Sequence, residues 1–425
     1  MIASTANIKR NQIVGSVYTA MVCFLTYSCI FAFRKPFTVG LYTNMPSYWG
    51  VEFKNLLVIS QVLGYTASKV FGVKFISELK NVGRGKLILI LILISLVPLL
   101  LFPLVPTPFN ILCLFINGFP LGITWGIIFS FVEGRSGTDF IGAALGASII
   151  VSSGVVKSIG KWMQLYFHIN DMWIPFYTGL VFVVPMIILV YLLEQIPHPT
   201  PQEVALKSER LPMSKKERIH FFKNFMPGLV SFIFIYVVLT LFRDLRDNFA
   251  ADIWSNLGYN NSASVFTNTE LPIAIVVLTI IASMIMIKNN TLVFLISQYM
   301  IILGFLMVGI SSFLFQYNII NGFNWMLLVG LGLYIAYTPF NSILFDRMIA
   351  TFRLKGNVGY VIYLMDSFGY FASVVVISIK GAAHIKLNWA EFYAKGVFYC
   401  SIIGLAISII SLLYYIGKIK KIKYE

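Results

Sequence analysis

The sequence has 425 residues, of which 58% are hydrophobic and only 12% are charged, and its mean hydropathy is +0.83. Soluble domains carry about 25% charged residues, so this composition excludes a soluble globular protein and predicts a polytopic membrane protein. The net charge of +15 would suggest a nucleic-acid partner in a soluble protein. In a membrane protein it follows instead from basic residues that gather in cytoplasmic loops, so we expect membrane lipid and no nucleic acid as a partner.

Twelve apolar segments follow one another along the chain. Each is long enough for a transmembrane helix, which needs about 20 residues, and none shows the alternation that strands of a membrane barrel require. The predicted fold class is therefore all-α, with twelve transmembrane helices in two six-helix bundles. The segments are 13–37, 55–78, 86–104, 108–132, 140–163, 172–194, 225–246, 265–287, 291–316, 321–345, 357–380 and 391–416.

The longest loop follows the sixth segment and predicts the domain organisation. We expect an N-terminal bundle at 1–194, a basic cytoplasmic linker at 195–224 and a C-terminal bundle at 225–425. Ser214 and Glu217 form a capping box, which predicts that a short amphipathic helix begins in the linker. Its basic face would lie on the anionic inner leaflet or simply in water.

Basic residues predict the orientation of the chain. With the N-terminus inside, 20 of the 32 Lys and Arg residues lie in cytoplasmic loops, the linker or the termini, and only Lys54, Lys380 and Lys386 lie in outer loops. Such an excess marks the cytoplasmic side. We expect both termini in the cytoplasm and, for a bacterial protein, an integral protein of the inner membrane.

Arg34 and Lys35 end the first segment in "FAFRKPF", and Arg243 ends the seventh in "TLFRDLRDNF". A charge in hydrocarbon costs about 2.5 kcal/mol or more, so these residues are functional candidates. Two guanidinium groups at equivalent places in symmetry-related bundles would face each other and bind a phosphate or carboxylate bidentately. Reaching out to the membrane interface is the alternative for each arginine, and it is our expectation for Arg246.

Further polar residues within the apolar segments complete the candidate site. Lys69 lies midway along the second segment, one turn after Tyr65. In the tenth segment, Tyr334, Tyr337 and Asn341 are spaced to share one helix face. The candidate substrate-binding residues are Arg34, Arg243, Lys69, Tyr65, Tyr236, Tyr337 and Asn341. The candidates for coupling, or for ion pairs between the bundles, are Lys35, Asp244, Asp247, Glu270 and Asp366. Hydrogen bonds between helices are an equally good role for the polar residues of the tenth segment.

Other classes of chemistry lack their motifs in this sequence. We find no nucleophile–base set, no metal-ligand spacing and no phosphate loop of the GxxxxGK[ST] type, so we expect no enzyme, no metal and no cofactor. The cysteines fall in apolar runs, which predicts buried free thiols rather than a disulfide framework; they are Cys23, Cys29, Cys113 and Cys400.

Two six-helix halves joined by a long basic linker resemble the major facilitator superfamily. Within it, the chain resembles the organophosphate:phosphate antiporter (glycerol-3-phosphate transporter-like) family. That resemblance rests on "FAFRKPF" in the first helix, "GYTASK" in the second, the acids after Arg243 and the acid Glu270 before a proline in the eighth. It covers both halves of the chain. The family's histidine in the fifth helix has no counterpart in "GASIIVSSGVVK".

The resemblance implies that Arg34 and Arg243 clamp the substrate phosphate, with Lys69 beside it. It also implies ion pairs that change during the cycle, between Lys35 and an acid of the seventh helix and between Lys69 and Glu270. The implied function is secondary active transport of a small organic anion, an organophosphate exchanged for phosphate, by alternating access. We expect a monomer.

Two alternatives fit the same residues. One is a proton-coupled symporter of another small solute, in which Glu270, Asp366 or Glu133 titrates. The other is a non-transporting membrane sensor of the same fold. The sequence leaves the organic part of the substrate, the coupling ion and the direction of transport open.

Overall fold

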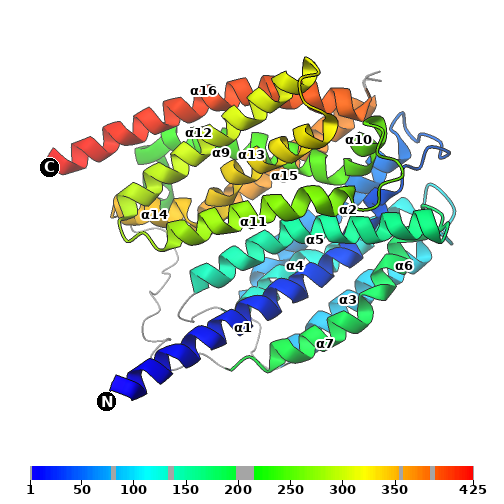
Figure 1. Cartoon of the computed structure of the whole chain (residues 1–425), viewed down its shortest axis with the longest axis horizontal. Helices are drawn as coiled ribbons and strands as arrows, with labels where there is room; N and C mark the ends of the chain where they lie inside the picture. The colour runs from blue at the N-terminus through cyan, green and yellow to red at the C-terminus, as the bar shows by residue number, and fades with distance from the viewer. Residues whose placement is uncertain are drawn as a thin grey trace. The chain divides into compact units, whose positions relative to one another are not determined.

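The computed structural model describes residues 2–77, 83–132, 138–197, 215–353, 358–382 and 388–424. These ranges are helical apart from turns, loops and one isolated bridge between Tyr48 and Val51. The predicted cap residue Ser214 and the acid Glu133 lie outside the described residues, as does Lys386. The predicted all-α class is confirmed, and Figure 1 traces the helices.

The first compact unit contains Met1–Lys207 together with Asn261–Ala274. Its helices from the first range are α1 (Ile2–Arg34), η1 (Pro36–Val39), α2 (Phe53–Ser77), α3 (Arg84–Leu101), α4 (Ile111–Ser130), α5 (Thr138–Tyr166), α6 (Ile174–Val181) and α7 (Val183–Glu194). Within it, α2 packs on α4, α1 on α5, and α3 on α4.

The second unit contains Ser208–Asn260 together with Ile275–Glu425. Its helices are α9 (Lys215–Asn248), α10 (Ala250–Asn256), α12 (Asn290–Gln316), α13 (Gly322–Ser342), α14 (Leu344–Thr351), α15 (Val358–Ala382) and α16 (Trp389–Tyr424). Within it, α12 packs on α13 and α16, and α9 packs on α15 and α16.

The helix α11 (Val265–Ile285) belongs partly to each unit, because its first residues group with the first unit. There it packs on α5, where the Ser158 hydroxyl lies 2.8 Å from Thr267 Oγ1 and accepts the Thr267 amide at 3.2 Å. The predicted C-terminal bundle at 225–425 includes Asn261–Ala274, which the structure groups with the first unit. For the rest of the chain, the predicted domain boundaries stay a prediction.

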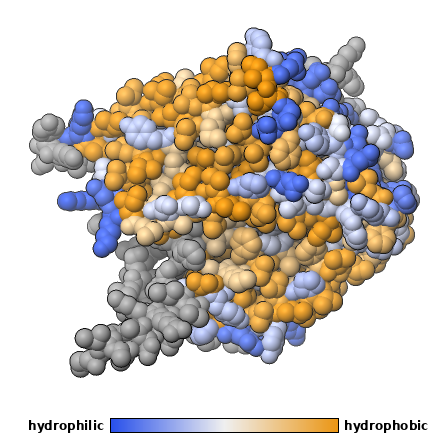
Figure 2. Space-filling model, viewed as in Figure 1, coloured by the Kyte–Doolittle hydropathy of each residue, from blue (hydrophilic) through white to orange (hydrophobic). Residues whose placement is uncertain are grey.

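Membrane-spanning helices dominate the described residues. Eight helices there are long and apolar enough to cross a membrane, or nine if the bent pair α6 and α7 is one span. α2, α5 and α15 are also predicted to span. They have 25, 29 and 25 residues, which is long enough to cross the hydrocarbon core. Hydrophobic side chains cover most of the face drawn in Figure 2, as expected where a helix faces lipid tails.

The structure corrects three predictions about single cations. Lys54 and Lys380, expected in outer loops, lie inside α2 and α15 and are 4% and 5% exposed. Lys54 Nζ donates to the Thr38 carbonyl at 2.9 Å, and Lys380 Nζ lies 4.0 Å from the centroid of the Trp389 ring. Arg246, expected at the membrane interface, is 3% exposed and donates to the Met326 carbonyl of α13 at 3.1 Å.

Candidate functional site

The first helix ends where proline interrupts it. α1 ends at Arg34, and η1 begins at Pro36, which has no backbone N–H to continue the helical bonding. Arg34 is only partly buried, while Lys35 beside it is 5% exposed. The break therefore places two adjacent cations within the helical bundle of the first unit.

The Arg34 side chain lies on an aromatic ring supplied by α2. Its guanidinium carbon is 3.8 Å from the centroid of the Tyr65 ring, which is 5% exposed. Lys69 Nζ, one turn later on α2, is 5.2 Å from the same centroid. A ring face attracts cations through its quadrupole, so the Tyr65 ring supports both cations. The structure thus brings together three predicted substrate-binding residues of the first unit.

Close packing between α2 and α4 puts that ring in place. A Cβ atom added to Gly118 of α4 would lie 2.5 Å from the Gln61 carbonyl oxygen, and one added to Gly122 would lie 2.6 Å from that of Tyr65. The two glycines thus allow the helix backbones to approach closely, as small residues do in membrane proteins. Tyr65 is thereby held against the end of α1.

A buried amide network holds the same end of α1. Gln61 Nε2 donates to the Arg34 carbonyl at 2.8 Å, and Asn117 Nδ2 of α4 donates to the Phe33 carbonyl at 2.9 Å. Asn117 is also bonded to Ser95 of α3 and accepts from Gln61 at 2.8 Å. Sequence reasoning missed these residues. The sequence marks them only as uncharged polar residues inside apolar segments. Such a residue is weaker evidence for a functional role than a charged residue in the same place.

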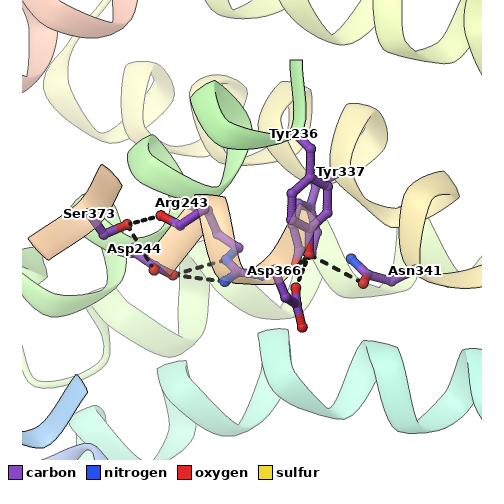
Figure 3. A network of polar contacts seen from close by, with 8 residues as sticks. Tyr236, Arg243, Asp244, Tyr337, Asn341, Asp366 and Ser373 are labelled. Carbon is purple, nitrogen blue, oxygen red and sulfur yellow. Dashed lines mark hydrogen bonds and ion pairs between the residues drawn. The ribbon is translucent and has the colours of Figure 1, made fainter. Parts of the chain in front are cut away.

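In the second unit, Arg243 of α9 has both an aromatic and an acidic partner. Its guanidinium carbon lies 4.2 Å from the centroid of the Tyr337 ring of α13. Its Nη2 forms an ion pair of 2.8 Å with Asp244 Oδ1, and the two side chains are 11% and 12% exposed. The hydroxyl of Ser373 on α15 donates to the other carboxylate oxygen at 3.2 Å. Figure 3 shows this arrangement.

Tyr236 joins the remaining predicted residues of this unit. It is 1% exposed, and its hydroxyl donates to the Asp366 carboxylate of α15 through a short hydrogen bond. The same hydroxyl lies 3.0 Å from the Tyr337 hydroxyl and 3.4 Å from Oδ1 of the exposed Asn341 (Figure 3). The tyrosine rings stack with centroids 5.3 Å apart. The four predicted substrate-binding residues of the second unit therefore form one cluster with Asp366 and Asp244.

Two parallel helices of this cluster, α9 and α15, meet in register. Tyr236 and Asp244 of α9 meet Asp366 and Ser373 of α15, so the partners rise together along both helices. Between these bonds, a Cβ atom added to Gly369 would lie 2.9 Å from Thr240 Cγ2. The glycine permits close contact of the helices, and the polar bonds above and below it set their register.

For two of the predicted coupling residues, Glu270 and Asp247, the structure gives the position and the packing. Glu270 of α11 packs against Gly154 of α5, where an added Cβ atom would lie 2.8 Å from Glu270 Cβ. Asp247 lies on α9 and is partly buried. The predicted pairing of Lys35 with an acid of α9, and that of Lys69 with Glu270, stay predictions.

A family model matches residues 36–418 of the chain and is described as a family of unknown function, DUF5690. No curated protein matches the chain by sequence.

Solved structures match almost the whole chain. A D-xylose–proton symporter matches with a TM-score of 0.56 and 14% identity, over 92% of this chain and 97% of its own. A mutant of the nucleoside transporter NupG matches at 0.58 and 15% identity, over 95% and 99%. The xylose transporter XylE from E. coli, in a partially occluded inward-open conformation, matches at 0.61 and 12%, over 95% and 98%.

These likenesses confirm the predicted major facilitator fold of an integral membrane protein with multiple spans. They give no support to the predicted likeness to organophosphate:phosphate antiporters, because the three structures named above are sugar and nucleoside transporters. That narrower assignment stays a hypothesis.

Proposed function

The chain belongs to DUF5690, a family of unknown function, and has the major facilitator fold; from this premise we propose that it is a secondary active transporter of a small organic anion. The substrate class we favour is an organophosphate, exchanged for phosphate by alternating access. This proposal rests on the side chains of the two clusters, because a shared fold alone does not define a substrate.

One observation carries the proposal: the first long helix of each unit presents an arginine that lies on a tyrosine ring. Arg34 lies over Tyr65 in the first unit, and Arg243 lies over Tyr337 in the second. The rings hold the guanidinium planes without consuming all of their N–H donors, since a cation–π contact uses the face of the cation. Donors at the edge can still bind phosphate or carboxylate oxygens in pairs.

Asp244 gives the second arginine a partner before substrate arrives. Its carboxylate binds the Arg243 guanidinium as a substrate carboxylate or phosphate would. A substrate anion therefore competes with Asp244 for Arg243, and release of the substrate restores the internal pair. Because Asp244 binds Arg243 again when the substrate leaves, the empty site does not bear the free-energy cost of a buried arginine without a counter-ion.

Proteoliposomes test the proposal directly. Vesicles loaded with inorganic phosphate should exchange it for external organophosphate or labelled phosphate, and Arg34→Ala or Arg243→Ala should abolish the exchange. Arg34→Lys keeps the charge but loses the bidentate fork, so it should restore little activity. Arg347→Ala is a matched control, because Arg347 binds Asn290 on another helix, at 2.6 Å, outside both clusters. Exchange that survives in both arginine variants would contradict the proposal, and saturable binding without exchange would indicate a sensor.

A second candidate, proton-coupled symport, is favoured by the Asp366 cluster. A carboxylate bonded to Tyr236 within the bundle is a group whose protonation changes its hydrogen bonds to neighbouring helices. One matched structure is itself named a D-xylose–proton symporter. Uptake driven by an imposed pH gradient into vesicles without counter-substrate, lost in Asp366→Asn, would favour this candidate over exchange.

A further inference from the structure

We propose that Gln61 and Asn117 are positioning residues, which hold the end of α1 so that Arg34 keeps its place on Tyr65. The proposal rests on the proposed function, in which Arg34 binds the anion. Neither residue is placed in contact with the substrate. Their effect on binding is transmitted through Arg34.

The end of α1 leaves carbonyl groups that need donors. The last carbonyls of any helix lack intrahelical partners, and Pro36 supplies no N–H at this point. The Phe31 carbonyl still accepts from the Lys35 amide at 2.9 Å. The carbonyls of Phe33 and Arg34 accept instead from Asn117 and Gln61, at 2.9 and 2.8 Å. Two side-chain amides thus replace the missing turn of helix.

The network admits one orientation of both amide groups. Carbonyl oxygens only accept, so Gln61 Nε2 must face the Arg34 carbonyl and Asn117 Nδ2 must face those of Phe33 and Ser95. The Ser95 hydroxyl returns a bond of 3.1 Å to the Asn117 carbonyl. Gln61 is 3% exposed, and Asn117 and Ser95 are both 0% exposed. A buried polar network that is satisfied in only one way fixes the geometry of the groups attached to it.

One face of α2 therefore fixes Arg34 at two points. Gln61 binds the backbone of Arg34, and Tyr65, one turn later, lies under its guanidinium group. An apolar side chain at position 61 would fill the space but would leave the carbonyl without its donor. The amide network holds the backbone from which the guanidinium extends, and the ring holds its end.

The test compares Gln61→Met with Gln298→Met in the purified full-length chain. Both changes replace a buried helical glutamine by an apolar side chain of similar size, and Gln298 lies on α12 of the second unit. Two quantities are measured: the dissociation constant for inorganic phosphate, and the rate at which phenylglyoxal modifies Arg34 and Arg243, followed by mass spectrometry of their peptides. Arg243 serves as an internal reference for general loosening of the chain.

The proposal predicts that Gln61→Met raises the modification rate of Arg34 by about tenfold and leaves that of Arg243 within about twofold, because only one helix end opens. Phosphate binding should weaken about tenfold, as expected when a binding group is displaced. Gln298→Met should change neither the modification rate of Arg34 nor the dissociation constant for phosphate. Asn117→Leu is the second variant and should act on Arg34 in the same direction.

An unchanged Arg34 rate in both Gln61→Met and Asn117→Leu would overturn the proposal, as would equal acceleration at both arginines. If the Arg34 rate alone rises but wild type does not bind phosphate, the positioning role stands and the proposed anion site fails. The two claims are therefore separated by the same experiment.

Discussion

The two candidate arginines share an aromatic support but differ in their charged neighbours. Arg34 shares the ring of Tyr65 with Lys69, whereas Arg243 is paired with Asp244 beside Tyr337. In the proposed transporter, the substrate anion takes the place of Asp244 at Arg243.

The aromatic support of Arg34 should contribute measurably to anion binding. A cation–π contact contributes about 0.5–2 kcal/mol, so Tyr65→Leu should weaken binding roughly two- to thirtyfold. Tyr65→Phe retains the ring and is the matched control, with binding close to that of wild type. Calorimetric titration with phosphate checks both variants. Equal affinity in the leucine and phenylalanine variants would show that the ring does not support the site.

Removing the internal competitor should have the opposite effect on affinity. Asp244→Asn removes the carboxylate that binds Arg243 but keeps an oxygen for the Ser373 hydroxyl. Anion binding should tighten several-fold, whereas the ligand-free protein should lose about 3 kcal/mol or more of stability, because a buried cation loses its partner. Titration and thermal unfolding without and with phosphate measure the two effects. Weaker phosphate binding by this variant would contradict competition.

At the scale of helices, close contacts through glycine align the residues of each cluster. Gly118 and Gly122 bring α4 against α2 beside Gln61 and Tyr65, and Gly369 brings α15 against Thr240 of α9. Side chains larger than hydrogen at these points would push the helix pairs apart. The clusters depend on this packing as much as on their polar bonds.

A pair of alanine substitutions isolates this packing effect. Alanine in a helix interior is better than glycine by about 1 kcal/mol, so Gly146→Ala, which meets no atom within 4 Å, should stabilise the protein slightly or leave it unchanged. Gly122→Ala should destabilise it by about 1–3 kcal/mol, since the new atom overlaps the Tyr65 carbonyl. Thermal unfolding in detergent compares the two. Equal effects would show that the contact of α2 with α4 is loose.

Much of the helical fold could be predicted, because a long apolar run identifies a membrane-spanning helix. The segment predicted at 86–104 corresponds to α3 (Arg84–Leu101), and that at 265–287 to α11 (Val265–Ile285). The break between α6 and α7 at Phe182 was not predicted, although Gly179 and Pro185 flank it and Pro185 has no N–H to bond the Val181 carbonyl. The end of the last helix also differs from the prediction. The segment was predicted at 391–416, whereas α16 continues through the basic tail to Tyr424.

The candidate site could be predicted where a charge stood in an apolar run. Arg34, Arg243 and Lys69 are candidates on that ground. The burial of Arg246 could not be predicted. Packing alone decides whether an arginine near a helix end reaches water or a buried carbonyl such as that of Met326. Gln61 and Asn117 carry no charge, so their role depends on three-dimensional neighbours that the sequence does not display.

At the scale of the whole molecule, basic residues predict which ends of the helices face the cytoplasm. A C-terminal fusion to a fluorescent protein should therefore fluoresce in a bacterial host, and a fusion to alkaline phosphatase after Asn318 should be enzymatically active, since that loop follows the ninth predicted span. The reverse pattern would show that the chain is inverted in the membrane. This measurement does not depend on the identity of the substrate.

The central claim is an anion site that needs both arginines, and the thermal stability of the purified protein tests it most directly. Wild type, Arg34→Ala and Arg243→Ala are heated with phosphate, glycerol phosphates, hexose phosphates, carboxylates, sugars and amines. A ligand at 100 times its dissociation constant stabilises the folded state by about 2.7 kcal/mol. A phosphate compound should raise the melting temperature of wild type and of neither variant. Stabilisation by uncharged or cationic compounds alone would contradict it.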